Sequence, residues 1–326
     1  MAKLPKNLQD IFNTKEEYLN SQRMNLEKNV ISMQEKLLNK VISDIVSEMD
    51  TENGQIKQTT KNMRLISQLE QTYEQFNATT QIPVIKEFGK GLIGIGTYQK
   101  NYFDSLLSDN SIKKRFTSVV NNTDEFMKAR IGVGTKNEII EGGFLDSFIK
   151  DRTLVNDLKQ ITMRSVTGQM PIDEYKTLLK YKVIGNEQVD GKFQQYYKQF
   201  AYDQYNEYDR AYANTLATEF KLDYAIYQGG LIDESRDFCR DHNGFVYTRD
   251  EISRFGEWTY AKAEHITFFN DSGDKVGVPS YISKYPMYNP YVSLGGFSCR
   301  HSLSWVDKIT AVRLRPELKE IESKKL

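Results

Sequence analysis

Both cysteines and two of the three histidines of this chain lie in two short clusters toward its C-terminal end. One cluster reads Cys239-Arg240-Asp241-His242, and the other reads Cys299-Arg300-His301. Cysteine thiolate and neutral imidazole are ligands that suit zinc, and four such protein ligands leave no open position for water. The two clusters therefore predict one structural zinc ion with Cys239, His242, Cys299 and His301 as its ligands.

The spacing within each cluster favours convergence on a single ion. Cys239 and His242 are separated by two residues and followed by Asn243-Gly244, a pair typical of turns. We expect residues 298–306 to form a strand, on which the Cys and His of the second cluster project from the same face. A plainer interpretation treats the cysteines as small buried hydrophobes and the histidines as hydrogen-bonded core residues. His265 belongs to neither cluster, and we expect it at the surface.

Two enzymatic alternatives use the same residues. A cysteine beside a histidine can become an activated nucleophile, but each cysteine here has its own histidine and no oxyanion-hole motif is visible. A metal-dependent nuclease of the His-Asn-His kind is the stronger alternative. The order of Asp241-His242, Asn289, Gly295-Gly296 and Cys299-Arg300-His301 is similar to that family. The family's further metal-binding histidine has no counterpart after His301, and its Cys-x-x-Cys pairs are missing.

A glycine fingerprint occurs earlier in the chain. Gly89, Gly91 and Gly94 spell the G-x-G-x-x-G of a dinucleotide-binding turn. That motif requires a buried strand directly before it, whereas residues 83–88 are few and include Lys86 and Glu87. We interpret these glycines as sites of close helix packing.

The first part of the chain has the pattern of a long helical hairpin. No Pro or Gly occurs from Thr14 to Asp50, and apolar residues recur there every three or four positions. A breaker at residues 51–54 is followed by the same period from Met63 to Phe76. Because helical periodicity lies on both sides of Asn53-Gly54, we expect an αα-hairpin rather than a β-hairpin.

Helical patterns continue through the middle of the chain. Glycines between Asn121 and Gly143 indicate a boundary, so we expect a helical N-terminal region over residues 1–130 and a second domain over residues 131–326. Helices are predicted over Asp146–Val166 and Ile172–Tyr181. An aromatic stripe then predicts one long helix over residues 193–227, whose rings we assign to the core rather than to base stacking because acidic residues interleave with them. The stripe comprises Tyr197, Phe200, Tyr208, Tyr212, Leu216, Phe220 and Tyr224.

Beyond Gly229-Gly230 the pattern changes to short elements. Residues 245–247 predict a strand, and Thr248–Glu251 match a capping box that starts a helix running through Arg254. Residues 268–296 read as loop, and residues 316–326 as a charged, fraying terminal helix. The predicted fold is mainly α, with a long N-terminal helical hairpin and a small α+β C-terminal module.

Composition limits the classes of function. The 326 residues include 44 Lys and Arg against 44 Asp and Glu, so no net charge draws the whole chain to nucleic acid or to an anionic membrane. The mean hydropathy is −0.60 and no stretch approaches a spanning helix, so we expect no membrane insertion. The first residues lack the apolar core of a secretory leader, and with only two cysteines we expect reduced thiols.

Several segments together resemble a known family. They are Asp209-Arg210-Ala211-Tyr212-Ala213-Asn214, Asp233-Glu234-Ser235-Arg236-Asp237-Phe238-Cys239, His242-Asn243-Gly244-Phe245-Val246-Tyr247, Asn289-Pro290 and Gly296-Phe297-Ser298-Cys299-Arg300-His301. In this order they resemble the Mu F-like minor head proteins, or head morphogenesis proteins, of tailed bacteriophages. Cys239 stands five residues before Gly244, as in that family. Cys299-Arg300-His301 stands where the family has an Asn-Cys-Arg-Cys-like signature, with His301 replacing the last Cys.

The resemblance covers about residues 146–306, and it implies a structural, non-enzymatic virion protein. Such a protein associates with the portal vertex or the inner face of the capsid, in several copies in a ring or vertex, and acts in head assembly, genome packaging or ejection. The expected partners are portal or capsid proteins, with packaged DNA as an open alternative and with no membrane. The expected location is the virion, and the host cytoplasm during assembly. A DNA-binding internal virion protein and the His-Asn-His-like nuclease are the alternatives.

Overall fold

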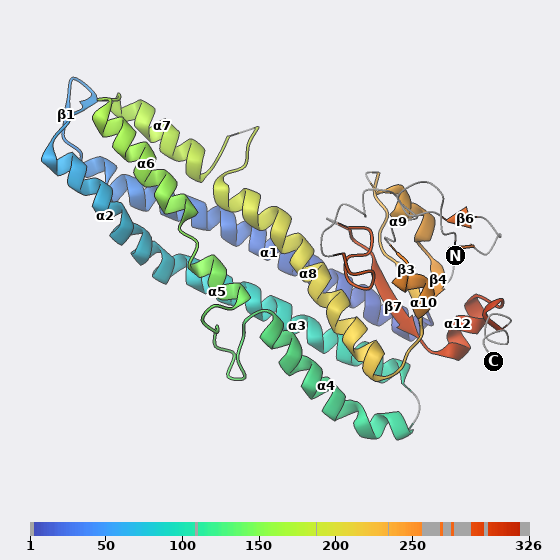
Figure 1. Ribbon diagram of the computed structural model, residues 1–326. Helices are drawn as coiled ribbons and strands as arrows, with labels where there is room; N and C mark the ends of the chain where they lie inside the picture. Colours follow the sequence, from blue (N-terminus) through green and yellow to red (C-terminus); the bar gives the residue numbers. More distant parts are fainter. Residues whose placement is uncertain are drawn as a thin grey trace. The chain divides into compact units, whose positions relative to one another are not determined.

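The computed structural model describes residues 3–107, 110–186, 188–233, 235–255, 268–269, 275–276, 288–296 and 299–319. The protein is mainly helical, with a small α+β module toward its C-terminus, as the sequence predicted (Figure 1). The chain forms two compact units. Unit 1 contains Met1–Asn20, Leu92–Met127 and Tyr202–Leu326, and unit 2 contains Ser21–Gly91 and Lys128–Ala201. Each unit contains residues from both sides of the boundary expected at residues 130 and 131.

In the described part of the chain, eight α-helices precede β3 (Tyr224–Gln228), the first strand of the C-terminal module. They are α1 (Lys6–Asp44), α2 (Thr60–Phe76), α3 (Ile82–Leu106), α4 (Asn110–Arg130), α5 (Phe144–Ile149), α6 (Thr153–Thr167), α7 (Ile172–Val183) and α8 (Lys192–Glu219). The helices α1, α3, α4 and α8 each contain residues of both units. Each unit therefore combines segments that are far apart in the sequence.

The connection between α1 and α2 corrects the expectation of an αα-hairpin rather than a β-hairpin, because both are present. The helices form the expected hairpin (Figure 1), and a 3₁₀ turn over Val46–Glu48 ends the first of them. Between them β1 (Thr51–Glu52) pairs with β2 (Gln55–Ile56). Asn53 and Gly54 have φ values of 49° and 79°, the pair of positive values that a tight β-hairpin requires. A two-residue β-hairpin therefore closes an αα-hairpin.

The glycine fingerprint lies inside helix α3, so it forms no phosphate-binding turn. A Cβ on Gly89 would come within 2.7 Å of Leu145 Cδ1, in unit 2. A Cβ on Gly94 would overlap the hydroxyl of Tyr18, in unit 1. The interpretation as close packing positions is confirmed for Gly89 and Gly94.

Two helix boundaries of unit 2 differ from the prediction. The helix expected over residues 146–166 is interrupted between α5 and α6, where Asp151 Oδ1 accepts a hydrogen bond from Thr153 N and starts a new helix. A π-helical turn over Asn77–Gln81 joins α2 to α3. Asn77 and Gln81 are buried there, and their amides donate to the carbonyls of Ile149 and Phe148. These polar contacts tie the π turn to the end of α5.

The aromatic stripe of α8 lies in the core, as expected: Tyr197, Tyr208, Tyr212, Leu216 and Phe220 are all buried. The prediction that the helix continues to residue 227 is wrong. The helix ends at Glu219, Lys221 adopts a left-handed φ of 54°, and Tyr224–Gln228 form strand β3. Residues 224–227 are all buried, and an unbroken apolar run of this length is typical of a central strand.

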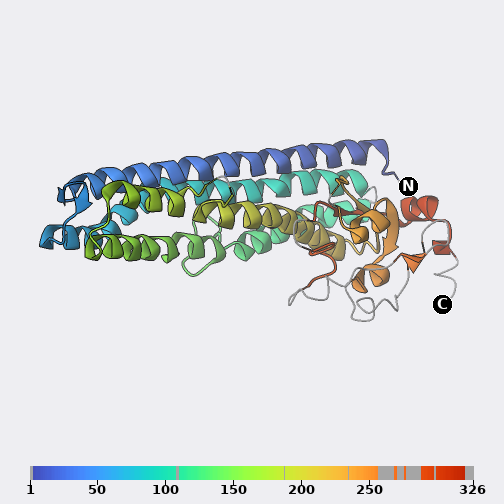
Figure 2. The same ribbon diagram turned by 90° about the horizontal axis from the view of Figure 1, so that it is seen from above.

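The module near the C-terminus is built on a three-stranded antiparallel sheet in unit 1. Strand β3 lies between β4 (Phe245–Thr248) and β7 (Ser302–Val306). The short helices α9 (Asp237–His242), α10 (Arg249–Ser253) and α12 (Lys308–Leu314) complete the module (Figure 2), and two-residue strands pair at Phe268–Phe269 (β5) and Lys275–Val276 (β6). The predicted capping box of Thr248 and Glu251 is present at the start of α10. The strand predicted over residues 298–306 is shorter, so Cys299 and His301 precede it.

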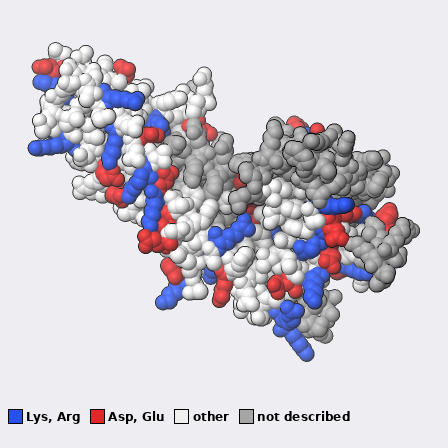
Figure 3. All heavy atoms as spheres, viewed as in Figure 1, with Lys and Arg blue, Asp and Glu red and all other residues white. Residues whose placement is uncertain are grey.

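Two further expectations concern regions that are described only in part. His265 and residues 320–326 of the predicted terminal helix lie outside the described residues. Within the described residues, no helix combines the length and apolar character needed to cross a bilayer. On the face shown in Figure 3, Lys and Arg are interspersed with Asp and Glu over the described surface, which agrees with the balanced net charge.

Candidate metal centre

The two cysteines meet in the core of unit 1. Cys239 lies on α9 and Cys299 lies just before β7, and their Sγ atoms are 3.8 Å apart. The Nδ1 atom of His301 is 3.9 Å from Cys299 Sγ. One ligand atom from each of Cys239, Cys299 and His301 lies within 4.8 Å of the other two, and all three residues are buried. This group could hold a metal ion.

A tyrosine that the sequence analysis assigned to a helix lies beside the two cysteines and His301. Tyr227, on the central strand β3, is fully buried. Its hydroxyl lies 3.4 Å from Cys239 Sγ and 3.6 Å from Cys299 Sγ. Its ring stacks on the imidazole of His301, with centroids 4.9 Å apart and an interplanar angle of 22°. The phenol oxygen therefore contacts both sulfurs.

The two thiols differ in how readily they ionise. Burial opposes ionisation of Cys299, but a hydrogen bond from Cys239, the guanidinium of Arg210 and the contact with His301 hold the pKa of Cys299 well below its usual range. The hydrogen bond to Cys299 and burial raise the pKa of Cys239. The Cys299 thiol therefore ionises more readily than the Cys239 thiol. A thiolate is the form that binds metal.

His242, the remaining predicted ligand, is buried beside this group but is not one of the three residues whose ligand atoms cluster. Its Nδ1 lies 2.8 Å from the carbonyl oxygen of Phe238. A carbonyl only accepts, so Nδ1 carries the proton in this contact. Burial lowers the pKa of His242 to about 3, so the imidazole is neutral near pH 7.

The interpretation of the histidines as hydrogen-bonded core residues fits His301 poorly. His301 is 1% exposed, and its Nε2 has no hydrogen-bond partner among the described residues. Leaving such a group buried and unsatisfied costs about 1–3 kcal/mol. The nitrogen of His301 near Cys299 Sγ is Nδ1, so a ligand role through Nδ1 would not supply a partner for Nε2.

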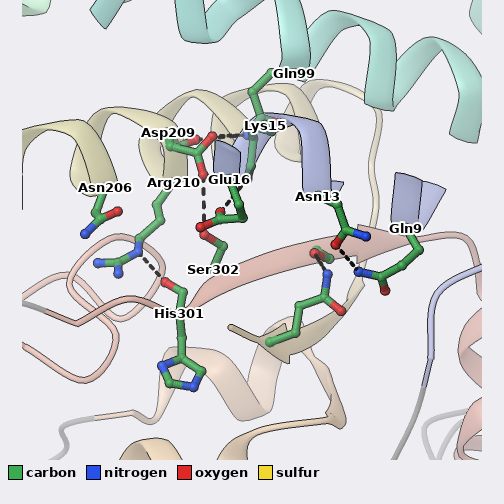
Figure 4. A network of polar contacts seen from close by, with 12 residues as sticks. Gln9, Asn13, Lys15, Glu16, Gln99, Asn206, Asp209, Arg210, His301 and Ser302 are labelled. Carbon is green, nitrogen blue, oxygen red and sulfur yellow. Dashed lines mark hydrogen bonds and ion pairs between the residues drawn. The ribbon is translucent and has the colours of Figure 1, made fainter. Parts of the chain in front are cut away.

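Helix α8 holds the backbone that carries Cys299 and His301. The guanidinium of Arg210 donates from Nε to His301 O at 2.7 Å, from Nη1 to Val292 O at 3.0 Å, and from Nη2 to Cys299 O. Asn206 Nδ2, one helical turn earlier, also donates to Cys299 O. Figure 4 shows the ring of His301 pointing away from Arg210. Arg210 therefore binds the backbone carbonyl of His301 and makes no contact with its imidazole in this view.

The same face of α8 carries a buried carboxylate. Asp209 accepts from Lys15 Nζ at 2.7 Å, from Gln99 Nε2 and from Ser302 Oγ (Figure 4). Lys15 and Asp209 are both almost fully buried, although 194 residues separate them. The start of α1 is thereby fixed against α8 and against strand β7, which follows Cys299 and His301.

Gly229 gives a direct test of how closely the chain packs behind His301. A Cβ at this position would lie 2.7 Å from His301 Cα and 2.9 Å from Arg300 O, which are backbone atoms of the segment whose Cys299 and His301 carbonyls accept from Arg210. We expect Gly229→Ala to destabilise the protein by about 1–3 kcal/mol through overpacking and to weaken metal binding by displacing His301. Urea unfolding and metal titration measure the two effects.

The adjacent glycine is the matched control. A Cβ on Gly230 would meet nothing within 4 Å. Gly230→Ala should therefore leave both stability and metal binding near the wild-type values. Equal behaviour of the two variants would contradict the packing described here.

Sequence reasoning identified the cysteines and His301 but missed the residues that position them. Asn206, Asp209 and Arg210 follow an i, i+3, i+4 spacing inside an aromatic stripe, which places polar groups on a buried face of α8. Polar residues at helical spacing inside an aromatic stripe were therefore the sequence signal from which these positioning residues could have been found. Tyr227 was missed because its strand continued the aromatic period of the preceding helix.

Comparison of the chain with protein-family models, with curated proteins and with solved structures yields no match.

Proposed function

We propose that this protein is a structural minor head protein of a tailed bacteriophage. In this proposal it associates with the portal vertex or the inner face of the capsid, in several copies, and acts in head assembly, genome packaging or ejection. It resides in the virion, and in the host cytoplasm during assembly. Its C-terminal module is stabilised by a zinc ion.

The observation that carries the proposal is the meeting of Cys239, Cys299 and His301. Their ligand atoms lie within 4.8 Å of one another, although 60 residues separate the two cysteines. These residues belong to the two segments in which the chain resembles the Mu F-like proteins most specifically. Had the sulfurs pointed to unrelated surfaces, the resemblance would have lost its main physical support.

The ligand set favours zinc in a structural role. Two sulfurs that are each about 2.3 Å from a tetrahedral zinc ion lie about 3.8 Å apart, which agrees with the observed 3.8 Å between Cys239 and Cys299. All three clustered residues are buried, and burial of the ligands is typical of structural sites, whereas catalytic sites keep a position open to substrate. The proposal therefore assigns no catalysis to the site.

Exposed apolar side chains support a role in docking. Met24 and Ile31 are 71% and 42% exposed and lie seven residues apart on α1, which places them on the same face of that helix. Leu178 and Tyr181, three residues apart on α7, are also exposed. In our proposal these positions of unit 2 contact the portal or capsid proteins.

The assignment is tested by following the protein through purification of its phage. Quantitative mass spectrometry of density-purified particles should find several copies of the chain per virion, and the chain should co-purify with the portal protein when the two are co-expressed. Absence from the particles together with failure to bind portal or capsid protein would overturn the proposal.

Two assays separate the alternatives. A His-Asn-His-like nuclease nicks plasmid DNA in the presence of a divalent metal and loses this activity in His242→Ala, whereas we expect no turnover in either protein. A DNA-binding internal protein retains duplex DNA with a strong dependence on salt, because phosphate neutralisation releases counterions. With equal numbers of acidic and basic residues, we expect weak retention at physiological salt.

A further inference from the structure

We infer that the hydroxyl oxygen of Tyr227 is the fourth ligand of the metal ion, in the position that the sequence assigned to His242. This inference rests on the zinc site of the proposed function and adds to it the identity of the ligand set, which becomes two sulfurs, one imidazole and one phenol oxygen. It does not depend on the phage assignment.

The distances around the hydroxyl are those between ligands that share one ion. In a tetrahedral zinc site with one bond of about 2.3 Å to sulfur and one of about 2.0–2.1 Å to a lighter atom, the two ligand atoms lie about 3.6 Å apart. Tyr227 Oη lies 3.4 Å from Cys239 Sγ and 3.6 Å from Cys299 Sγ. The separation of 3.9 Å between Cys299 Sγ and His301 Nδ1 is of the same size. The oxygen and the two sulfurs therefore form one face of such a tetrahedron.

The fold keeps the hydroxyl in this position. Tyr227 belongs to the central strand, paired with Phe245 on one side and Leu303 on the other. Its ring is stacked on His301 and meets the ring of Phe238 edge-on, with centroids 5.6 Å apart. A side chain enclosed in this way has little freedom to move its oxygen away from the sulfurs. The site is thus organised before the metal binds.

His242 is placed differently. Its imidazole packs against Phe238, with centroids 4.1 Å apart, and its Nδ1 contacts the carbonyl of the same residue. Its ring centroid is 5.8 Å from that of Tyr227, and its nitrogens are not among the ligand atoms that cluster within 4.8 Å. The hydroxyl oxygen of Tyr227 contacts both sulfurs, whereas His242 packs against Phe238.

Tyr227→Phe in the full-length protein removes the oxygen and keeps the ring. We expect its zinc affinity, measured by competition with a chromophoric chelator, to fall by at least the roughly 10–100-fold that loss of an outer-shell partner of a metal ligand causes. Tyr212→Phe is the matched control, because Tyr212 is a buried tyrosine of the same unit whose hydroxyl donates to Asp124 instead. Tyr212→Phe and His242→Gln should both keep near wild-type affinity. Wild-type affinity in Tyr227→Phe would overturn the inference.

Spectroscopy of the zinc-loaded protein identifies the ligands directly. X-ray absorption should find two sulfurs, one imidazole and one further light atom, whereas two imidazoles would overturn the inference in favour of His242. A phenol bound to zinc gives up its proton, so the zinc-minus-apo ultraviolet difference spectrum should contain a tyrosinate band that Tyr227→Phe lacks. Absence of that band from the wild type would reduce Tyr227 to a hydrogen-bond donor and overturn the inference.

Experiment distinguishes failure of the zinc proposal from failure of the Tyr227 inference. A wild-type protein that holds no zinc would remove the metal from the proposed function, and Tyr227 would then have no ion to bind. A wild-type protein with about one zinc ion and a fully functional Tyr227→Phe site would leave the zinc proposal intact and overturn only this inference.

Discussion

Removal of zinc is expected to produce the largest loss of stability in this protein. If the free zinc concentration exceeds the dissociation constant 1,000-fold, binding to the folded state alone contributes about 4 kcal/mol. Cys299→Ser should lose the same contribution, because it removes the sulfur whose ionised form Arg210 and His301 favour. Thermal unfolding monitored by circular dichroism, with and without chelator, measures the effect, and elemental analysis should find about one zinc per wild-type chain.

The same experiment contains its own control. Because Cys299→Ser has already lost the site, chelator should not lower its melting temperature further, and added magnesium should restore neither protein. A chelator-induced shift of equal size in the wild type and in Cys299→Ser would show that the metal acts elsewhere in the chain.

The second large effect is expected from the buried ion pair of Lys15 and Asp209. Lys15→Ala leaves the carboxylate of Asp209 buried without its cation, and breaking a buried pair in this way costs about 3–5 kcal/mol. Gln99 and Ser302 still donate to Asp209, but neither neutralises its charge. Urea unfolding compares the variant with Lys6→Ala, a control at an exposed lysine of the same helix.

A double variant distinguishes charge from packing. Lys15→Met with Asp209→Asn removes both charges; the amide oxygen can still accept from Gln99 and the amide nitrogen can donate to Ser302 Oγ, so the double variant should recover most of the stability lost in Lys15→Ala. If the double variant is no more stable than Lys15→Ala, the loss arises from packing around Lys15 and the electrostatic explanation is wrong.

Local patterns were sufficient wherever neighbours in the sequence decide the conformation. The apolar period from Thr14 to Asp50 predicted α1, and the capping box at Thr248 and Glu251 predicted the start of α10, because helical period and capping depend on residues three or four positions apart. The same reasoning excluded a phosphate loop at Gly89. It was wrong at Tyr224 and Tyr227, because an aromatic run of this length fits a buried strand as well as a helix.

From its sequence alone this protein could be recognised as mainly helical with a small C-terminal α+β module, and its rare Cys and His residues could be selected as candidate metal ligands, since both inferences depend on residue type and on short spacings. Only the tertiary structure decided which of those side chains lie close to one another. It brought Cys239, Cys299 and His301 together, placed His242 beside them, and added Tyr227. It also paired Lys15 with Asp209 across 194 residues. Such contacts depend on how helices and strands pack on one another, and no local pattern in the chain records that packing.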